Sequence, residues 1–153
     1  MEQKYIKPFF HAIATTFDRM IGASVKPLDA SLKQDFSRVH NVTAIIGMSG
    51  DLVGAVVLSM SFETARAVVA AFLQMDDMLE EEELADAVGE LVNIIAGSAK
   101  AKFEGMDVTI STPTIAIGDS HQIRAPRVVP VIEIPCSSDL GDFVVDVAIS
   151  NRE

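Results

Sequence analysis

LADAVGELVNIIAGSAKA, residues Leu84–Ala101, is an apolar run that polar residues interrupt at regular intervals. At about 100° per residue, four residues fall within about 60° of one another on a helix, and they are Asp86, Glu90, Asn93 and Gly97. The side chains that gather on the opposite side are apolar: Leu84, Val88, Leu91, Ile95 and Ala99. The spacing therefore predicts a helix with a core face and a polar stripe, the name used here for Asp86, Glu90, Asn93 and Gly97.

Gly97 is an unusual residue for the middle of this helix. Glycine in a helix interior costs on the order of 1 kcal/mol relative to alanine. Its place on the polar stripe indicates that something approaches the helix closely there, either a partner or a neighbouring element of the chain.

Length and composition limit the class of protein. A chain of 153 residues suits a single domain, residues 1–153, with a sizeable core, and a hydrophobic fraction of 49% indicates a compact protein. The net charge of −10 opposes nucleic-acid binding, which needs a clustered cationic surface. Apolar runs such as Ala67–Leu73 are far shorter than the roughly 20 residues of a membrane helix. We expect a soluble protein that binds neither nucleic acid nor a membrane.

The single cysteine, Cys136, cannot form an internal disulfide, and the first residues lack the apolar segment of a secretory signal. We therefore expect a cytoplasmic location and a small buried thiol. The three histidines, His11, His40 and His121, show no ligand spacing, so no metal site is expected. No phosphate-binding glycine loop is present in the sequence either.

The remaining elements follow from periodicity and from turn residues. Apolar spacing predicts a helix over Tyr5–Met20 that stops at Gly22, and Ser61 is a candidate N-cap for a shorter helix. The acidic run Glu80–Glu83 suits the exposed first turn of the long helix, which we expect to end near Gly105. The predicted strands are Val25–Leu32, Asn41–Met48, Leu52–Met60, Val108–Gly118, Val128–Pro135 and Phe143–Ser150, with turns at Ser49–Asp51 and Ser137–Gly141.

This order of elements indicates an internal duplication. A helix followed by three strands occurs twice, which predicts an α+β fold with helices on one side of a mainly antiparallel sheet. Superposing Gly22 on Gly105 aligns the first helix with the long one. In this register Lys7 falls opposite Glu90 and Phe10 opposite Asn93, so only the second half carries the polar pair.

The long helix resembles the signature of the CheC/CheX/FliY phosphatases of bacterial chemotaxis, in which an Asp or Ser, a Glu and an Asn are followed by a downstream Pro. The matching residues are Asp86, Glu90, Asn93 and Pro113. The similarity to the CheX branch extends over nearly the whole chain, through Tyr5–Phe9, Ile45–Gly50, Ser111–Thr114, Gly118, His121 and Gly141–Phe143. CheC-type members typically carry two Glu/Asn sites and CheX-type members one. The only other asparagines, Asn41 and Asn151, lie outside the first helix, which favours the CheX branch.

The resemblance implies a CheC-like fold and a protein phosphatase that hydrolyses the aspartyl phosphate of a CheY-like response regulator. It implies Asn93 as the residue that orients the attacking water and Glu90 as the residue that engages the regulator's active-site lysine. Asp86 is expected to serve docking or helix geometry, Gly97 to give clearance for a partner, and Pro113 to shape the strand rather than touch substrate. It further implies a homodimer without a cofactor of its own, since the Mg²⁺ belongs to the phosphorylated receiver.

Two other functions stay open from the sequence. A non-catalytic receiver-binding or scaffold module is one, as the related flagellar switch protein FliM uses a similar fold without phosphatase activity. The presence of both Glu90 and Asn93 counts against it. A small-molecule-binding domain is the other, and it rests only on the plausibility of the fold.

Overall fold

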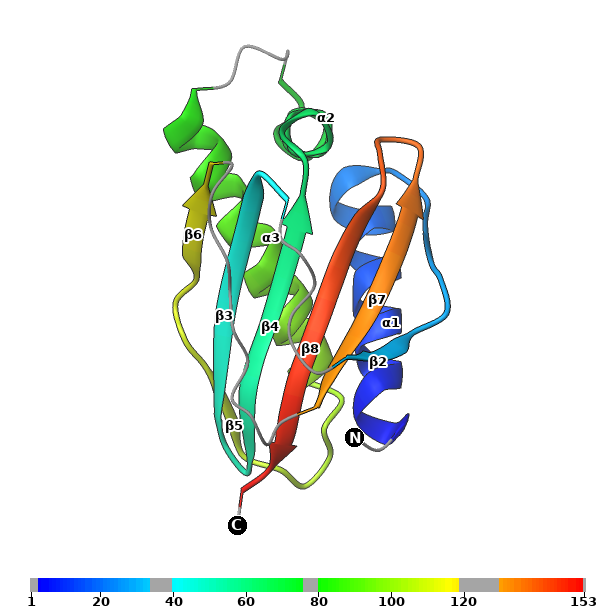
Figure 1. The fold of residues 1–153 in the computed structure, drawn as a ribbon, viewed down its shortest axis with the longest axis vertical. Helices are drawn as coiled ribbons and strands as arrows, with labels where there is room; N and C mark the ends of the chain where they lie inside the picture. Colours follow the sequence, from blue (N-terminus) through cyan, green and yellow to red (C-terminus); the bar gives the residue numbers. More distant parts are fainter. Residues whose placement is uncertain (1–2, 34–39, 76–79, 119–129, 153) are drawn as a thin grey trace.

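The computed structural model describes residues 3–33, 40–75, 80–118 and 130–152 (Figure 1). Within these ranges the helices are α1 (Gln3–Thr16), which continues into a π-helical turn η1 (Phe17–Ile21), α2 (Phe62–Leu73) and α3 (Glu81–Lys100). The strands are β1 (Val25–Pro27), β2 (Ser31–Lys33), β3 (Val42–Gly50), β4 (Leu52–Met60), β5 (Val108–Ile110), β6 (Thr114–Ile117), β7 (Val131–Ser138) and β8 (Phe143–Asn151).

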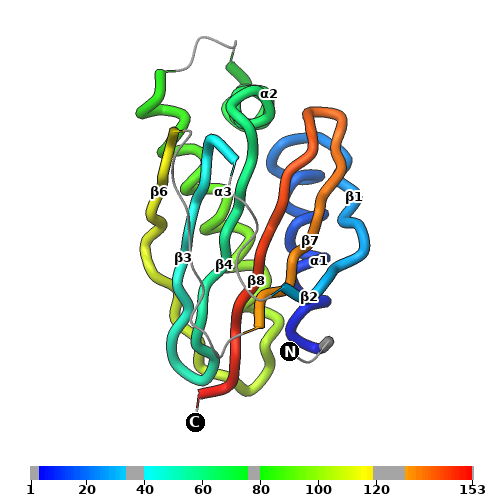
Figure 2. The backbone as a smooth tube through the Cα atoms, viewed as in Figure 1, coloured from blue at the N-terminus to red at the C-terminus, as the bar shows by residue number. Residues whose placement is uncertain are grey.

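All eight strands form one antiparallel sheet in the order β1-β7-β8-β4-β3-β5, with β2 paired to β7 and β6 paired to β3. Helices α1 and α3 cover one face of the sheet, and α2 lies across its end beyond β4 (Figures 1 and 2). The predicted α+β fold is therefore confirmed. No helix in the described ranges combines the length and the apolar character needed to span a bilayer.

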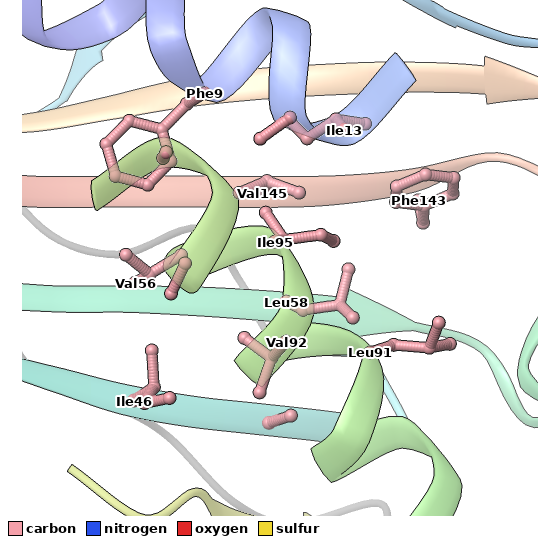
Figure 3. Close-up of a cluster of buried hydrophobic side chains, with 14 of the residues drawn as sticks. Phe9, Ile13, Ile46, Val56, Leu58, Leu91, Val92, Ile95, Phe143 and Val145 are labelled. Atoms are coloured by element: carbon pink, nitrogen blue, oxygen red, sulfur yellow. The ribbon is translucent and has the colours of Figure 1, made fainter. Parts of the chain in front are cut away.

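The core lies between this sheet face and the two long helices. Figure 3 shows Leu91, Val92 and Ile95 of α3 directed at β3, β4 and β8. On α1, Phe9 and Ile13 are fully buried in the same cluster. Each large aliphatic side chain buried in this way contributes about 1.5–3 kcal/mol relative to exposure. The apolar face of α3 therefore fixes which way its polar stripe points.

The structure confirms the internal duplication. In the register that superposes Gly22 on Gly105, the starts of β1 and β5 coincide at Val25 and Val108, and those of β2 and β6 at Ser31 and Thr114. The two halves interlock, because β1 and β2 of the first half pair with β7 of the second, while β5 and β6 pair with β3. The hairpins β3–β4 and β7–β8 then meet at the centre of the sheet.

Two predicted single strands are wrong. Val25–Leu32 divides into β1 and β2, and Val108–Gly118 divides into β5 and β6. In each break, three residues of the divided segment lie opposite two residues of the neighbouring strand. In the first half the break lies between the pairs Pro27↔Cys136 and Ser31↔Glu133. In the break between β5 and β6, three residues likewise lie opposite two residues of β3. Such a bulge interrupts the ladder, and prolines, which donate no N–H, lie beside both breaks.

The helix ends depend on local chemistry. Gly22 closes the first helix in the left-handed conformation, with φ of 76°, as predicted. The Oγ atom of Ser61 accepts a hydrogen bond of 3.1 Å from the amide of Thr64, which confirms the predicted N-cap. The expected end of the long helix near Gly105 is wrong, because α3 ends at Lys100. Tighter turns follow it, in which the amide of Phe103 donates to the carbonyl of Lys100.

The other predicted strands agree with the structure apart from their ends. The β3–β4 ladder closes at Met48↔Gly54, so the predicted turn at Ser49–Asp51 is confirmed. Strand β7 runs from Val131 to Ser138, which is further than the predicted Pro135. The first two residues of that predicted strand lie outside the described residues.

Burial makes the thiol of Cys136 unreactive in the folded protein. The side chain is 1% exposed, and burial raises its pKa from 9.0 to about 12. We expect no reaction with Ellman's reagent at pH 8 until urea unfolds the chain, because the thiolate is the reactive form. A folded protein that labels as fast as the unfolded one would contradict this.

The same raised pKa makes stability depend on pH. The unfolded thiol ionises near 9.0 and the folded one near 12, so the contribution of this thiol is complete below about pH 9. It is lost as the pH rises from 9 toward 12. Urea unfolding of wild type and Cys136→Ala across this range measures the effect, and the wild type should lose more stability than the variant.

Candidate functional site

The acidic run forms the start of α3, as the sequence predicts. Glu80 is the N-cap, and a capping box links it with Glu83, whose Oε1 atom accepts a hydrogen bond of 3.3 Å from the Glu80 amide. Residues Glu80–Glu83 are all exposed, and negative charge at this end favours the helix dipole. The run therefore anchors the helix that carries the polar stripe.

The structure places the whole polar stripe along one outward side of α3. The predicted apolar side is between 0% and 2% exposed at Leu84, Val88, Leu91, Ile95 and Ala99. On the stripe, Asp86 and Glu90 are exposed, while Asn93 and Gly97 are half-buried. Around the helix, Asn93 is the stripe residue nearest to Gly89, whose side of α3 faces β6.

Edge strands β5 and β6 border the stripe. The sequence interpretation missed Gly89, which is buried, and at which an added Cβ would lie 3.2 Å from Pro113 Cγ and 3.2 Å from Ile115 Cδ1. Pro113 stands at the break between β5 and β6, as its predicted shaping role requires. The signal for Gly89 was present as a second glycine in the apolar run, one position before Glu90.

Gly97 differs from Gly89 in its surroundings. An added Cβ would meet nothing nearer than Ile110 Cδ1 at 4.0 Å, which is ordinary contact. The close approach inferred from the sequence therefore does not come from the described part of this chain. A side chain as small as that of alanine would fit at Gly97 without displacing a described neighbour.

A shallow groove of about 410 Å³ lies between the start of α3 and β6. Its lining residues are Glu81, Glu82, Ala85, Ile115 and Ile117. Two acidic residues thus border an apolar floor formed by Ala85, Ile115 and Ile117, between the first turn of α3 and β6. A docked partner would meet negative charge along this end of the site.

The first half of the fold carries no equivalent of the polar pair. Lys7 and Phe10 occupy the positions of Glu90 and Asn93 and line a separate groove of about 750 Å³ between α1 and the segment Pro27–Leu32. Among the described residues, no group of three or more histidine, cysteine or acidic side chains could hold a metal ion. His11 and His40 are exposed, and His121 lies outside the described residues.

The family model for the chemotaxis phosphatase CheX matches residues 42–137, a range that contains the whole polar stripe and Pro113. The chain belongs to the CheX family of chemotaxis phosphatases. The resemblance noted from the sequence is thereby confirmed.

Individual relatives of the CheX family match nearly the full chain. The curated CheY-P phosphatase CheX of Thermotoga maritima is 27% identical and covers 99% of both chains. A crystal structure of the chemotaxis protein CheX from Desulfovibrio desulfuricans is 30% identical with a TM-score of 0.85, over 97% of this chain and 99% of that one. A CheX-CheY-BeF3-Mg²⁺ complex from Borrelia burgdorferi is 25% identical with a TM-score of 0.78, over 96% and 98% of the chains.

The chemistry that the stripe can offer is limited to a carboxylate and a carboxamide. Asp86, Glu90 and Asn93 include no hydroxyl, thiol or imidazole, so a carboxylate is the only covalent nucleophile that they could offer. The carboxamide has both an acceptor and donors, so it can hold a water molecule in one orientation. The carboxamide of Asn93 therefore suits a reaction in which water is the attacking group.

Proposed function

We propose that this chain accelerates hydrolysis of the aspartyl phosphate of a CheY-like response regulator. The observation that carries the proposal is the pair Glu90 and Asn93, one helical turn apart on an outward stripe that also carries Gly97. Two relatives support it: the Thermotoga protein is named a CheY-P phosphatase, and the Borrelia protein was crystallised with CheY.

Asn93 is the catalytic residue of the proposal. An acyl phosphate is already activated, so the catalyst has chiefly to align a water molecule with the phosphorus. The Asn93 side-chain oxygen accepts a hydrogen bond from that water, and the amide brings no negative charge toward the phosphoryl oxygens. Its half-buried position on the α3 surface limits the orientations that the side chain can adopt.

Glu90 docks the receiver. Its exposed carboxylate, one turn before Asn93, pairs with the receiver's active-site lysine and so sets the distance from Asn93 to the phosphoryl group. Asp86, exposed another turn back, extends the same acidic line for docking. Gly97 gives the receiver's active-site loops room to reach the helix.

The metal ion in the proposal is the receiver's own Mg²⁺, which neutralises the phosphoryl oxygens, and this chain needs no cofactor.

The proposal treats residues 1–153 as one domain that acts in the cytoplasm, where receivers are phosphorylated. It also includes the homodimer that the CheX branch implies. Light scattering of the purified protein tests the homodimer, since one chain has a mass of 16.4 kDa.

The function is tested by mixing the protein with each phosphorylated receiver of its own cell and following phosphate release. We expect one receiver to lose phosphate faster in proportion to the amount of protein added. Absence of acceleration with every receiver would contradict the proposal. Tight binding of a BeF3-loaded receiver without turnover of its phosphorylated form would instead identify a non-catalytic scaffold.

A further inference from the structure

We propose that Gly89 and the bulge Ser111–Pro113 form a positioning unit, which builds a second wall of the docking surface beside Glu90 and Asn93. The inference rests on the proposed function, because the receiver docked on the stripe would also contact this wall. None of these four residues touches the reacting atoms. They act by holding β6 against α3.

The helix side of the unit is the backbone at Gly89. A Cβ at this position would stand 3.2 Å from Pro113 Cγ and 3.2 Å from Ile115 Cδ1, closer than nearly all real Cβ contacts. The absent side chain therefore lets β6 pack directly on the helix. The contact lies one residue before Glu90, so Pro113 and its exposed neighbours Thr112 and Thr114 border the stripe.

The strand side of the unit is held by Ser111. Its amide donates a hydrogen bond of 2.9 Å to the carbonyl of Gly47, and the Gly47 amide donates one of 2.8 Å to Ser111 Oγ. The hydroxyl in turn donates to the carbonyl of Thr112 at 2.9 Å. The side chain thus replaces the backbone bond that the bulge omits on β3, and it fixes the loop that ends in Pro113.

The first half of the fold has the corresponding segments, but a groove separates its helix from its bulge. In the register of the duplication, Ile6 stands for Gly89, Leu28 for Ser111 and Ala30 for Pro113. The Leu28 amide still donates a hydrogen bond of 2.8 Å to the carbonyl of Pro135, but leucine has no hydroxyl that could take the part of Ser111 Oγ. Ile6, Leu28 and Ala30 all line the 750 Å³ groove. Among the described residues, the bulge therefore packs directly against the helix only in the half that carries Glu90 and Asn93.

Ser111→Ala and Ser111→Thr form a matched pair, because only the second keeps the hydroxyl. Ser111 is exposed, so both variants should fold. We expect Ser111→Ala to raise KM for the phosphorylated receiver about fivefold, the size of one neutral hydrogen bond, with kcat unchanged. Ser111→Thr and the control Ser31→Ala, on the exposed strand β2 of the first half, should keep the wild-type KM. A wild-type KM for Ser111→Ala, or an equal rise for Ser111→Thr, would overturn the inference.

Gly89→Ala is a second variant, which separates a structural role of this glycine from a positioning role. Alanine favours a helix over glycine, but its methyl group would crowd Pro113 and Ile115, so the melting temperature reports the balance of the two effects. A purely structural role predicts unchanged kinetics. A positioning role predicts a several-fold higher KM, partly relieved by adding Ile115→Val, which removes the Cδ1 atom that the new methyl group meets. A wild-type KM for Gly89→Ala would overturn the contact as a determinant of docking.

Nuclear magnetic resonance of the free protein separates this inference from the proposed function. Ser111→Ala should shift the Glu90 backbone amide and the Asn93 side-chain amide, whereas Ser31→Ala should not. Unchanged resonances in Ser111→Ala overturn the positioning unit, whatever the protein hydrolyses.

If the wild type accelerates no receiver, the proposed function fails. In that case, a fivefold weaker affinity of Ser111→Ala for a BeF3-loaded receiver would still support the second wall. An equal affinity would overturn it.

Discussion

Asn93→Ala is expected to lower the maximal rate of receiver dephosphorylation by about 100-fold or more while the protein stays folded. Loss of one group that is preorganised for the transition state typically costs 10²–10³ in rate, about 2.7–4 kcal/mol. Alanine is a better helix former than asparagine, so α3 should be at least as stable. Single-turnover decay of the phosphorylated receiver at saturating variant measures the effect, and unchanged acceleration would remove Asn93 from the mechanism.

Two further variants show whether the carboxamide itself matters. Asn93→Asp keeps the shape of the side chain but brings a negative charge toward the phosphoryl group, so we expect a loss as large as that of alanine. Ser98→Ala changes the same helix away from the stripe and should keep the wild-type rate. A fully active Asn93→Asp protein would show that neutrality is unimportant.

Glu90→Ala is expected to weaken receiver docking and to reduce the rate as well. Removing one partner of a docked charge pair costs about 2–5 kcal/mol, so KM should rise by at least about 30-fold. The rate at saturation should also fall, because Glu90 sets where Asn93 meets the phosphoryl group. Initial rates over a range of receiver concentrations separate the two effects, and an unaltered concentration dependence would contradict the docking role.

A charge-neutral variant tests the electrostatic part of this prediction. Glu90→Gln keeps the length of the side chain and removes the charge, so its KM should depend less on ionic strength than that of the wild type. Glu104→Gln removes an exposed charge from the turn after α3, outside the stripe, and should leave the KM of the wild type unchanged. Equal effects of Glu90→Gln and Glu104→Gln would indicate general rather than specific attraction.

Local chemistry made much of the fold predictable. The two faces of α3 follow from the spacing of Leu91 and Ile95 against Glu90 and Asn93, because one helical turn decides which side chains share a side. The stop at Gly22 and the cap at Ser61 likewise depend on a few neighbouring residues. The family resemblance rested on the same local pattern, extended by matches along the chain.

Strand continuity was not predictable in the same way. Pro27 and Pro113 mark points where the segments Val25–Leu32 and Val108–Gly118 can break, but they do not say how the chain pairs on either side, and each segment contains a bulge. A bulge exists only relative to the strand beside it, and the partner strands β7 and β3 are distant in sequence. No local window contains that register.

The helical period is enough to place Asp86, Glu90, Asn93 and Gly97 on one side of α3, opposite an apolar face that must be buried. The tertiary structure alone decided what surrounds them. It placed Pro113 against Gly89, and it packed β6 against the helix in one half while leaving a groove in the other. The physical reason is that a helix face is set by residues three and four apart, whereas contacts between α3 and the edge strands depend on pairings between distant segments.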